Sequence, residues 1–431
     1  MNQSVSPVQR FEGEINLPPD KSISHRAALF AALASGISTI CNYSPAADPA
    51  STLSCLRQLG VNIQRDGNVV RVNGVGRDGF QAPEEALDCG NSGTTMRLLT
   101  GIVAGAGIEC TLTGDDSLRS RTMKRIIDPL RSMGCSIRGR DKEYAPLNVG
   151  SNDGVRAIRY PLPIASAQLK SCVLLAGLYG EEPTEVIEQL FSRDHTERLL
   201  NLETEPYGTG KIIRSDVGHK IPLQNYSVPG DFSAAAFWLV AGSIRPGSEV
   251  HLNSVGMNPS RIAMLHILKQ MGADIEIIHS KDEGREPVAD LIVRHSELKP
   301  IKLDPGLIPN CIDELPILMV AMCFSDGESV ISEAEELRHK ETDRLSAMAE
   351  ILLQAGADIT ETEDGVVIRG QHGFEPQAAS YPTYHDHRMA MSAAVLASAS
   401  SGTSEIQHAE CTAISYPDFW DHFQDLMVSS G

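Results

Sequence analysis

The sequence is missing several features that would place it in a familiar class at once. It has no run of about 18 apolar residues and no basic, apolar leader, so it predicts neither a membrane span nor a secreted protein. It has no GxxxxGK loop, and no GxGxxG follows a predicted strand, which argues against the common nucleotide-binding loops. We therefore expect a cytoplasmic protein with no membrane contact.

The nine cysteines are too widely spaced to form a metal or redox motif. No two of them lie within ten positions of each other, so CxxC and zinc-ligand spacings do not occur, and a cytoplasmic setting disfavours disulfides. His385 and His387 in the run HDH stay open as a metal-ligand pair, although no carboxylate–histidine partner motif lies near them. We predict a protein without a metal or another cofactor.

Positive charge is also scarce. The 37 Lys and Arg residues face 56 Asp and Glu residues, which gives a net charge of −19 and argues against a general nucleic-acid or acidic-membrane surface. A basic cluster in such a chain is either a solvated face or a site for a small anion. With 431 residues, 42% of them hydrophobic, the chain is long enough for two or three globular domains.

A helix-and-hairpin unit recurs along the chain. In each copy an amphipathic helix ends, a glycine follows, and two alternating strands are joined by a polar turn. Four close copies occupy residues 56–74, 130–150, 268–295 and 352–370, and a degraded fifth copy without the glycine occupies residues 199–216. Since copies lie on both sides of a boundary near residues 225–233, we predict an α+β protein of two similar halves with a ligand cleft between them. The alternative is the helix–glycine–strand pattern common to many α/β proteins.

The first cluster of candidate site residues opens a helix predicted over residues 18–36. Lys21, Ser22 and Arg26 lie at its N-terminal end, where the helix macrodipole makes cations mildly unfavourable. Ser22 and Arg26 are four residues apart and share a face. With the free backbone N–H groups, these side chains predict a cradle for a phosphate or carboxylate. In the alternative, Ser22 or Ser24 is an ordinary N-cap and the cations are solvated.

Two further clusters lie in the first half of the chain. A loop with Asn91 and Gly93 precedes an apolar helix, and Arg97 lies one turn into that helix. Glycines in such a loop let backbone N–H groups approach a ligand closely. In residues 117–134, Arg121 and other cations crowd the start of one predicted helical stripe, and Pro129 lies inside the stripe, where proline can kink a helix.

The second half holds comparable clusters. In residues 336–356 we predict Lys340 and Arg344 on one helix, a like-charge pair that costs roughly 0.2–0.5 kcal/mol unless Glu341 or an anionic ligand offsets it. Shorter motifs of the same kind contribute Ser166, Gln168, Arg193, Asp313, His387 and Arg388. Several helix N-termini with cations predict a site for two small anions, and Asp313 and Glu341 are candidates for proton transfer within it. The residues alone thus indicate a transferase or lyase that acts on two anions and requires no metal.

A family resemblance is carried by eight motifs: PPDKSISHRA, CGNSGTTMRLLTG, SRTMKRIIDPLRSMG, ASAQLKSCVLLAGL, SRDHTERLL, IDELPIL, HKETDRLSAM and DHRMAMS. At these motifs, which span nearly the whole chain, the sequence resembles the 5-enolpyruvylshikimate-3-phosphate synthases. The resemblance implies transfer of the enolpyruvyl group of phosphoenolpyruvate to the 5-hydroxyl of shikimate 3-phosphate, with release of phosphate. It implies two domains of three helix-and-strand repeats each, with the active site in the interdomain cleft. It also implies a monomer without a cofactor, and glyphosate as an inhibitor to test.

The resemblance implies domain bounds and residue roles. One domain would comprise residues 1–20 and 229–431, the other residues 21–228, with hinges near 20–21 and 226–231. Asp313, Glu341 and Lys21 would be catalytic. Shikimate 3-phosphate would be bound by Lys21, Ser22, Arg26, Ser166, Ala167, Gln168, Arg193, Asp313 and Lys340. Phosphoenolpyruvate would be bound by Lys21, Asn91, Gly93, Arg121, Gln168, Arg344, His387 and Arg388.

The sequence departs from the family pattern at two positions. Thr122 stands where many members have proline, and Ile414 stands where many carry a lysine. Ala167 and Arg193 resemble the second bacterial subclass, which often tolerates glyphosate, whereas Gly93 is not the alanine that blocks this inhibitor in some members. These residues leave glyphosate sensitivity open.

Two alternatives are kept beside this hypothesis. An enolpyruvyl transferase that acts on UDP-N-acetylglucosamine shares the fold, but that family carries a loop cysteine in the region of residues 117–121, where this sequence has none. A non-catalytic anion-binding relative would have lost its acids and cations, yet Asp313, Glu341 and Lys21 are all present.

Overall fold

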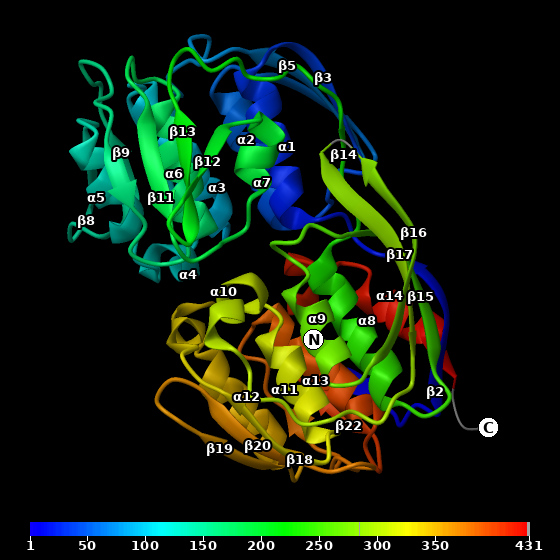
Figure 1. Cartoon of the computed structure of the whole chain (residues 1–431). Helices are drawn as coiled ribbons and strands as arrows, with labels where there is room; N and C mark the ends of the chain where they lie inside the picture. The colour runs from blue at the N-terminus through cyan, green and yellow to red at the C-terminus, as the bar shows by residue number, and fades with distance from the viewer. Residues whose placement is uncertain (284, 429–431) are drawn as a thin grey trace. The chain divides into compact units, whose positions relative to one another are not determined.

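The computed structural model describes residues 1–283 and 285–428 and divides into two compact units (Figure 1). Unit 1 comprises Met1–Pro18, Pro229–Asp282 and Pro287–Gly431, and unit 2 comprises Pro19–Val228 and Glu283–Glu286. The chain therefore starts in unit 1, builds most of unit 2 and returns to unit 1 at Pro229.

Unit 2 consists of short sheets and the helices that pack on them. Its helices are α1 (Lys21–Leu33), α2 (Ala47–Gln58), α3 (Gly93–Gly105), α4 (Asp116–Ser120), α5 (Lys124–Ser132), α6 (Ala167–Gly177) and α7 (His195–Leu200). Its strands are β3 (Ser35–Cys41), β4 (Asn62–Asp66), β5 (Val69–Val75), β6 (Leu87–Asp88), β7 (Cys110–Thr113), β8 (Ile137–Arg140), β9 (Tyr144–Val149), β10 (Arg159–Pro161), β11 (Thr184–Glu188), β12 (Glu203–Tyr207), β13 (Gly210–Ser215) and β14 (Tyr226–Ser227).

The sheets of unit 2 repeat one topology. Their strand orders are β14-β3-β5-β4, β6-β7-β9-β8 and β10-β11-β13-β12. In each sheet the first pair is parallel and the next two pairs are antiparallel, as Tyr226 opposite Ile40 and Ser38 opposite Val72 show in the first of them. Each hairpin is the second half of one sequence repeat.

Unit 1 is built from the same kinds of element. Its helices are α8 (Phe232–Ile244), α9 (Ala263–Gln270), α10 (Ile308–Cys311), α11 (Leu315–Cys323), α12 (Arg344–Gln354), α13 (His387–Ser398) and α14 (Phe419–Leu426), with 3-10 turns η1 (Pro305–Leu307), η2 (Glu335–His339) and η3 (Ala409–Ile414). Its strands are β1 (Gln3–Val5), β2 (Arg10–Asn16), β15 (Glu249–Gly256), β16 (Asp274–Glu283), β17 (Glu286–Arg294), β18 (Gly327–Ile331), β19 (Asp358–Glu361), β20 (Val366–Gly370), β21 (Ser380–Tyr381), β22 (Ser404–Ile406) and β23 (Met427–Val428).

The sheets of unit 1 follow the pattern in part: the first has a fifth strand, β23, antiparallel to β2, and the second consists of the three antiparallel strands β18, β20 and β19. Their strand orders are β16-β17-β15-β2-β23, β18-β20-β19 and β1-β22-β21. β2 lies parallel to β15, as the first strand of each unit 2 sheet does to its neighbour. In the third sheet the N-terminal strand β1 pairs antiparallel with β22, in the position that a local hairpin fills elsewhere. The N-terminus thus completes the last repeat, and the α+β fold of two similar halves predicted from sequence is confirmed.

The helix-ending glycines behave as the repeats predict. Gly60, Gly134, Gly272 and Gly356 have φ between +81° and +90°, a backbone region that side chains with a Cβ rarely adopt. In the degraded copy Asn201 occupies the left-handed C-cap of α7 with φ 55°. Asparagine tolerates this conformation better than other residues that carry a Cβ, which explains how the fifth copy keeps its turn without glycine.

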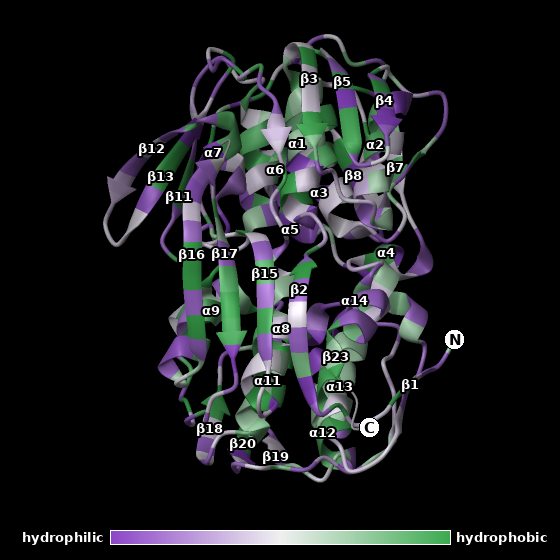
Figure 2. Cartoon of the chain, turned by 90° about the vertical axis from the view of Figure 1, so that its right-hand side faces the viewer, coloured by the Kyte–Doolittle hydropathy of each residue, from purple (hydrophilic) through white to green (hydrophobic). Residues whose placement is uncertain are grey.

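Each unit has its own hydrophobic core. Figure 2 shows hydrophobic and hydrophilic residues in bands along β5, where buried Val70 and Val72 alternate with exposed Arg71 and Asn73. Helices α8 and α11 are buried on every side, so they lack a polar face. Within residues 1–283 and 285–428, no single helix is long and apolar enough to cross a membrane, and one bent pair, Pro305–Cys311 with Leu315–Cys323, passes by length and composition only.

The structure corrects three local predictions. The N-cap of α1 is Asp20, whose carboxylate accepts the N–H of Ile23 at 2.8 Å, so neither Ser22 nor Ser24 caps this helix. The stripe predicted over residues 117–134 is two helices, α4 and α5, separated at Arg121. The segment predicted as one helix over residues 336–356 is η2 followed by α12, because Lys340 is extended and Asp343 caps a new helix.

Candidate active site

Lys21 is the first residue of α1 and is paired within unit 2. Its Nζ lies 3.1 Å from Oδ2 of Asp48 on α2, and about a fifth of its side chain is exposed. From Ile23, two residues farther on, to Leu33, the side chains of α1 are buried. The helix therefore presents Lys21 and the partly exposed Ser22 at its rim, and Arg26 one turn inside.

Arg26 is buried and bonded to neutral oxygens. Its Nε donates to Thr196 Oγ1 at 2.9 Å, its Nη2 to Ser171 Oγ at 3.1 Å and its Nη1 to the carbonyl of Ser22 at 3.1 Å. Burial, and then the nearby charge of Arg193, lower the pKa of Arg26 to about 10. Arg26 therefore brings positive charge beside that of Arg193 to a place where its own hydrogen bonds go to neutral oxygens, and such a place favours an anion.

A second basic cluster surrounds the loop before α3. Ser92 caps the helix, and a Cβ on Gly93 would meet Nη1 of Arg97 at 3.0 Å and Nη1 of Arg121 at 3.8 Å. Both guanidiniums thus converge on the backbone of Gly93. Arg121 also donates to Oδ1 of Asn91 at 2.7 Å, which fixes the loop against the C-cap of α4.

Gln168 joins this cluster to α6. Its Oε1 accepts a hydrogen bond from Nη1 of Arg97 at 2.6 Å, and its Nε2 donates to Oγ1 of Thr94 at 3.0 Å. Ser166 caps α6, and Ala167 is its first residue. α6 packs against α3 and, through Ser171 and Arg26, against α1. Unit 2 therefore gathers the predicted residues of α1, α3 and α6 into one region.

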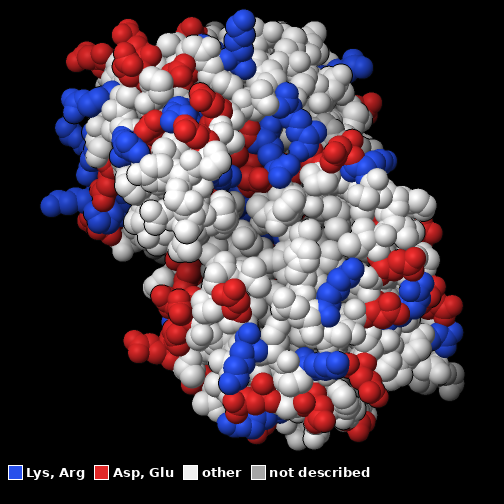
Figure 3. Space-filling model, in the orientation of Figure 1, with Lys and Arg blue, Asp and Glu red and all other residues white. Residues whose placement is uncertain are grey.

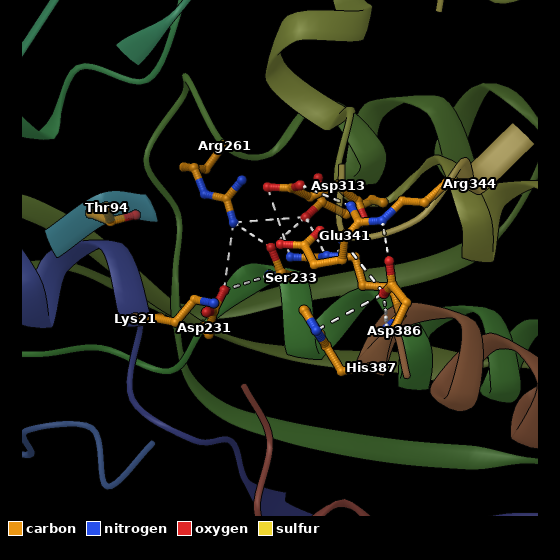
Figure 4. A network of polar contacts seen from close by, with 12 residues as sticks. Lys21, Thr94, Asp231, Ser233, Arg261, Asp313, Glu341, Arg344, Asp386 and His387 are labelled. Carbon is orange, nitrogen blue, oxygen red and sulfur yellow. Dashed lines mark hydrogen bonds and ion pairs between the residues drawn. The ribbon is translucent and has the colours of Figure 1, made fainter. Parts of the chain in front are cut away.

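Arg344 is the centre of the site in unit 1 (Figure 4). This buried guanidinium donates to Asp386 at 2.8 Å through Nε, to Glu341 at 2.5 Å through Nη2 and to Asp313 at 3.4 Å through Nη1. Burial alone would lower the pKa of Arg344, but the carboxylates of Asp386, Glu341 and Asp313 raise it above its usual value. Both proposed proton-transfer residues thus contact the same cation.

The first turn of α13 completes this arrangement. Asp386 is fully buried and caps the helix by accepting the N–H of Arg388 at 2.8 Å. Nη1 of Arg388 donates to the backbone carbonyl of Asp313 at 2.8 Å. His387 is buried beside them. Burial lowers the pKa of the Lys340 ammonium, although Asp313 opposes that shift, so this lysine is closer to its neutral form than a surface lysine is.

Sequence reasoning missed the polar layer beneath Asp313. Arg261, which is buried, donates to Ser233 Oγ at 2.5 Å, and Ser233 donates to the buried carboxylate of Glu314. Asp231, the N-cap of α8, lies 3.5 Å from the Arg261 guanidinium (Figure 4). Ser233 and Arg261 stand among apolar or small residues in the sequence, so no charge cluster marked them.

The structure also shows the surroundings of the proposed metal-ligand histidine His385 and of Thr122 and Ile414, where the sequence departs from the family pattern. The ring of His385 lies against that of His408, with centroids 4.1 Å apart and the ring planes tilted by 36°. Among the described residues, no group of three or more His, Cys, Asp or Glu side chains is arranged to hold a metal. Ile414 packs against the core of unit 1. The carbonyl of Thr122 accepts a long hydrogen bond of 3.5 Å from Arg97. On the face shown in Figure 3, acidic and basic side chains are interspersed over both units.

Comparison with known proteins decides the family. The family model for EPSP synthase (3-phosphoshikimate 1-carboxyvinyltransferase) matches residues 5–423. The chain belongs to this family. It is 48% identical over 432 residues to the 3-phosphoshikimate 1-carboxyvinyltransferase of Salinibacter ruber, covering 100% of both chains, and 48% identical over 427 residues to that of a Synechococcus strain, covering 96% of this chain and 95% of the relative. The resemblance stated from the motifs is thereby confirmed.

Solved structures agree with the fold of this family member. An EPSP synthase from Acinetobacter baumannii superposes with a TM-score of 0.89 at 38% identity, covering 99% of this chain and 98% of the other. The enolpyruvyl transferase NikO from Streptomyces tendae superposes with a TM-score of 0.78 at 17% identity, covering 98% of this chain and 96% of the other, which bears on the fold alone. The predicted enolpyruvyl transferase fold is confirmed.

Proposed function

We propose that the chain transfers the enolpyruvyl group of phosphoenolpyruvate to the 5-hydroxyl of shikimate 3-phosphate and releases phosphate, in the cytoplasm and as a monomer. Membership of the family supports this activity over transfer to UDP-N-acetylglucosamine and over a non-catalytic role. The single structural observation that carries the proposal is the cluster in unit 1, where the buried guanidinium of Arg344 donates hydrogen bonds to both Asp313 and Glu341.

The residues of unit 2 would bind the two anions. Arg26 and Arg193, with Ser22, Ser166, Ala167 and Gln168 nearby, would hold shikimate 3-phosphate, and the phosphate would supply the negative charge that the two guanidiniums favour. Asn91, Gly93 and Arg121 would hold phosphoenolpyruvate. Lys21 would contact both substrates.

The residues of unit 1 would carry the protons. Asp313, with Lys340 beside it, would accept the proton of the 5-hydroxyl as that oxygen bonds to C2 of phosphoenolpyruvate. Glu341 would give a proton to C3, which becomes a methyl group. In the second step C3 returns a proton and the C2–O bond to phosphate breaks, so the vinyl group is restored and the hydroxyl proton leaves with phosphate. Arg344, Arg388 and His387 would hold the carboxylate and phosphate of phosphoenolpyruvate.

We also propose that the two units are domains that close on the substrates about hinges near residues 20–21 and 226–231. The chain passes between the units at Pro18–Pro19 and at Val228–Pro229. Closure would therefore change the backbone conformation of these two connecting segments. Closure would exclude water and strengthen the charge contacts to both anions.

The test is phosphate release by the purified chain. We expect release with phosphoenolpyruvate and shikimate 3-phosphate, and none when UDP-N-acetylglucosamine replaces the shikimate substrate. Release only with the sugar nucleotide would support the alternative acceptor, and release with neither would support the non-catalytic relative. Glyphosate, titrated against phosphoenolpyruvate in the same assay, measures the sensitivity that Gly93 and Ala167 leave open.

A further inference from the structure

The β16–β17 hairpin is shared between the two units. β17 pairs with β15 in unit 1, where Val288 lies opposite Gly256, but residues Glu283–Glu286 belong to unit 2. The tip of this hairpin is therefore a third connection, in addition to the two hinge crossings. Figure 1 shows β16 and β17 as long ribbons that lie side by side.

Glu286 makes a buried contact with α7 in unit 2. Its Oε1 lies 2.8 Å from Nδ1 of His195, and the side chains are 2% and 1% exposed. An ionised carboxylate only accepts hydrogen bonds, so Nδ1 is the nitrogen that donates. The adjacent Arg285 donates to Oδ1 of Asn201 at 2.6 Å, at the opposite end of the same helix.

The first turn of α7 is fixed by three consecutive buried side chains. His195 bonds to Glu286, Thr196 accepts from Arg26, and Glu197 accepts from Lys170 at 2.7 Å. Each partner comes from a different element. Such a turn has little freedom to rotate, because every rotation breaks a buried polar contact.

In the sequence, Arg193 lies between the first turn of α7 and Ser192, a residue that is itself held by hydrogen bonds. The N–H and Oγ of Ser192 both donate to Glu188 Oε1, at 2.9 Å and 2.6 Å. The backbone of Arg193 is therefore held on one side by Ser192 and on the other by His195. Among these partners, Glu286 alone comes from β17, the strand that pairs with β15 of unit 1.

We propose that Glu286 is a positioning residue for shikimate 3-phosphate: through His195 it fixes the segment that aims Arg193 at the substrate phosphate. This inference rests on the proposed function, which assigns Arg193 to that phosphate. Glu286 itself does not touch the substrate. Its negative charge also acts weakly on the guanidinium of Arg26, the other arginine assigned to that phosphate.

The experiment compares Glu286→Ala, Glu286→Gln and Arg285→Ala in the full chain by steady-state kinetics and by calorimetric titration with shikimate 3-phosphate alone. We expect Glu286→Ala to raise the KM and Kd for shikimate 3-phosphate about tenfold or more, with kcat within about threefold, because a misplaced binding group costs affinity first. Glu286→Gln keeps an oxygen that accepts from His195 and should restore most of the affinity. Arg285→Ala is the matched control at the same hairpin tip and should leave KM unchanged.

A double variant tests whether Glu286 acts through Arg193. If it does, Glu286→Ala adds little to the loss of affinity in Arg193→Ala, since the misplaced group is already absent. Additive losses, or an unchanged KM in Glu286→Ala with only a lower melting temperature, would overturn the inference. Failure of the wild-type chain to turn over shikimate 3-phosphate would instead refute the proposed function, so the two failures are distinguishable.

Discussion

Replacing Lys170 with methionine removes a cation that has no access to solvent and leaves its carboxylate partners in place. Lys170 is 0% exposed and lies 2.8 Å from Glu188 and 2.7 Å from Glu197, whose side chains are 0% and 4% exposed. Lys211 remains as their other cationic partner, at 3.4 Å and 3.0 Å. Breaking a buried ion pair from one side typically costs about 3–5 kcal/mol, and we expect a loss of that size.

The assay is urea unfolding followed by two probes. With an m-value of roughly 3 kcal/mol per molar urea for a unit of this size, the loss corresponds to a midpoint lower by roughly 1–1.7 M urea. Trp238 and Trp420 both belong to unit 1, so circular dichroism should report the loss in unit 2 that tryptophan fluorescence does not follow directly. Lys211→Met is the matched control and should cost less, because Lys211 is 19% exposed and water replaces part of its interaction.

The stability deficit of Lys170→Met should also depend on pH, in a direction set by Glu197. Burial alone would raise the pKa of Glu197, but Lys170 and Lys211 more than offset it and hold that pKa below its usual value. In the wild type the carboxylate therefore adds stability above its unfolded pKa, near 4.3, and that stability is lost as the pH falls through the folded pKa. Without Lys170 the pKa of Glu197 should rise, so the deficit of the variant should shrink from pH 8 to pH 5. An unchanged midpoint at pH 8, or a deficit that grows on acidification, would refute the reasoning.

Three further outcomes are expected. Asp313→Asn and Glu341→Gln should each lower kcat by about 10²–10⁴ with small changes in KM, measured by phosphate release, because protons move mainly in the transition state; wild-type turnover in both would contradict the assigned roles. Gly101→Ala should lower the unfolding midpoint, at a cost of about 1–3 kcal/mol, because its Cβ would lie 2.4 Å from the carbonyl oxygen of Cys172 on α6; an unchanged midpoint would show that α3 and α6 can separate freely. Burial holds the pKa of His25 well below its usual value, so wild-type stability should fall as the pH drops below about 6.5, and His25→Gln should lose up to about 1.4 kcal/mol per pH unit of that dependence in calorimetric melts; an equal slope in both proteins would argue against a neutral His25.

The repeats could be predicted from sequence because their signals are local. A glycine that must adopt positive φ, followed by alternating strands, identifies each hairpin without any tertiary information. Even Asn201, which lacks the glycine signature, belongs to the small set of residues that tolerate this backbone region. The break at Lys340 was not predicted, because the helical pattern of residues 336–356 continues across it. The spacing of the apolar residues suggested one helix, although Asp343 is a residue type that often caps a new one.

Sequence also predicted one part of the candidate site and missed another. Lys21, Arg26, Arg344 and Arg388 were found because cations at helix N-termini conflict with the macrodipole and therefore call for an anion. Their partners were not found, since Arg26 meets Thr196 across 170 positions of sequence and no local rule relates two such residues. Which buried polar groups become hydrogen-bond partners depends on tertiary packing. A single sequence shows the types of side chain but not which of them are neighbours in the fold.

The two best-placed arginines differ in how their charge is balanced, and this bears on the proposed chemistry. Arg26 is bonded to hydroxyl and carbonyl oxygens, so an anion meets no bonded carboxylate there. Arg344 is already bonded to three carboxylates, and an anion must compete with one of them. Asp386 is fully buried, whereas Glu341 is the most exposed of the three, at 27%. Phosphoenolpyruvate that displaces Glu341 from Arg344 would take away a cation that favours the ionised form of this carboxylate. Binding of the substrate would thus convert a charge partner into the proton donor that the reaction needs.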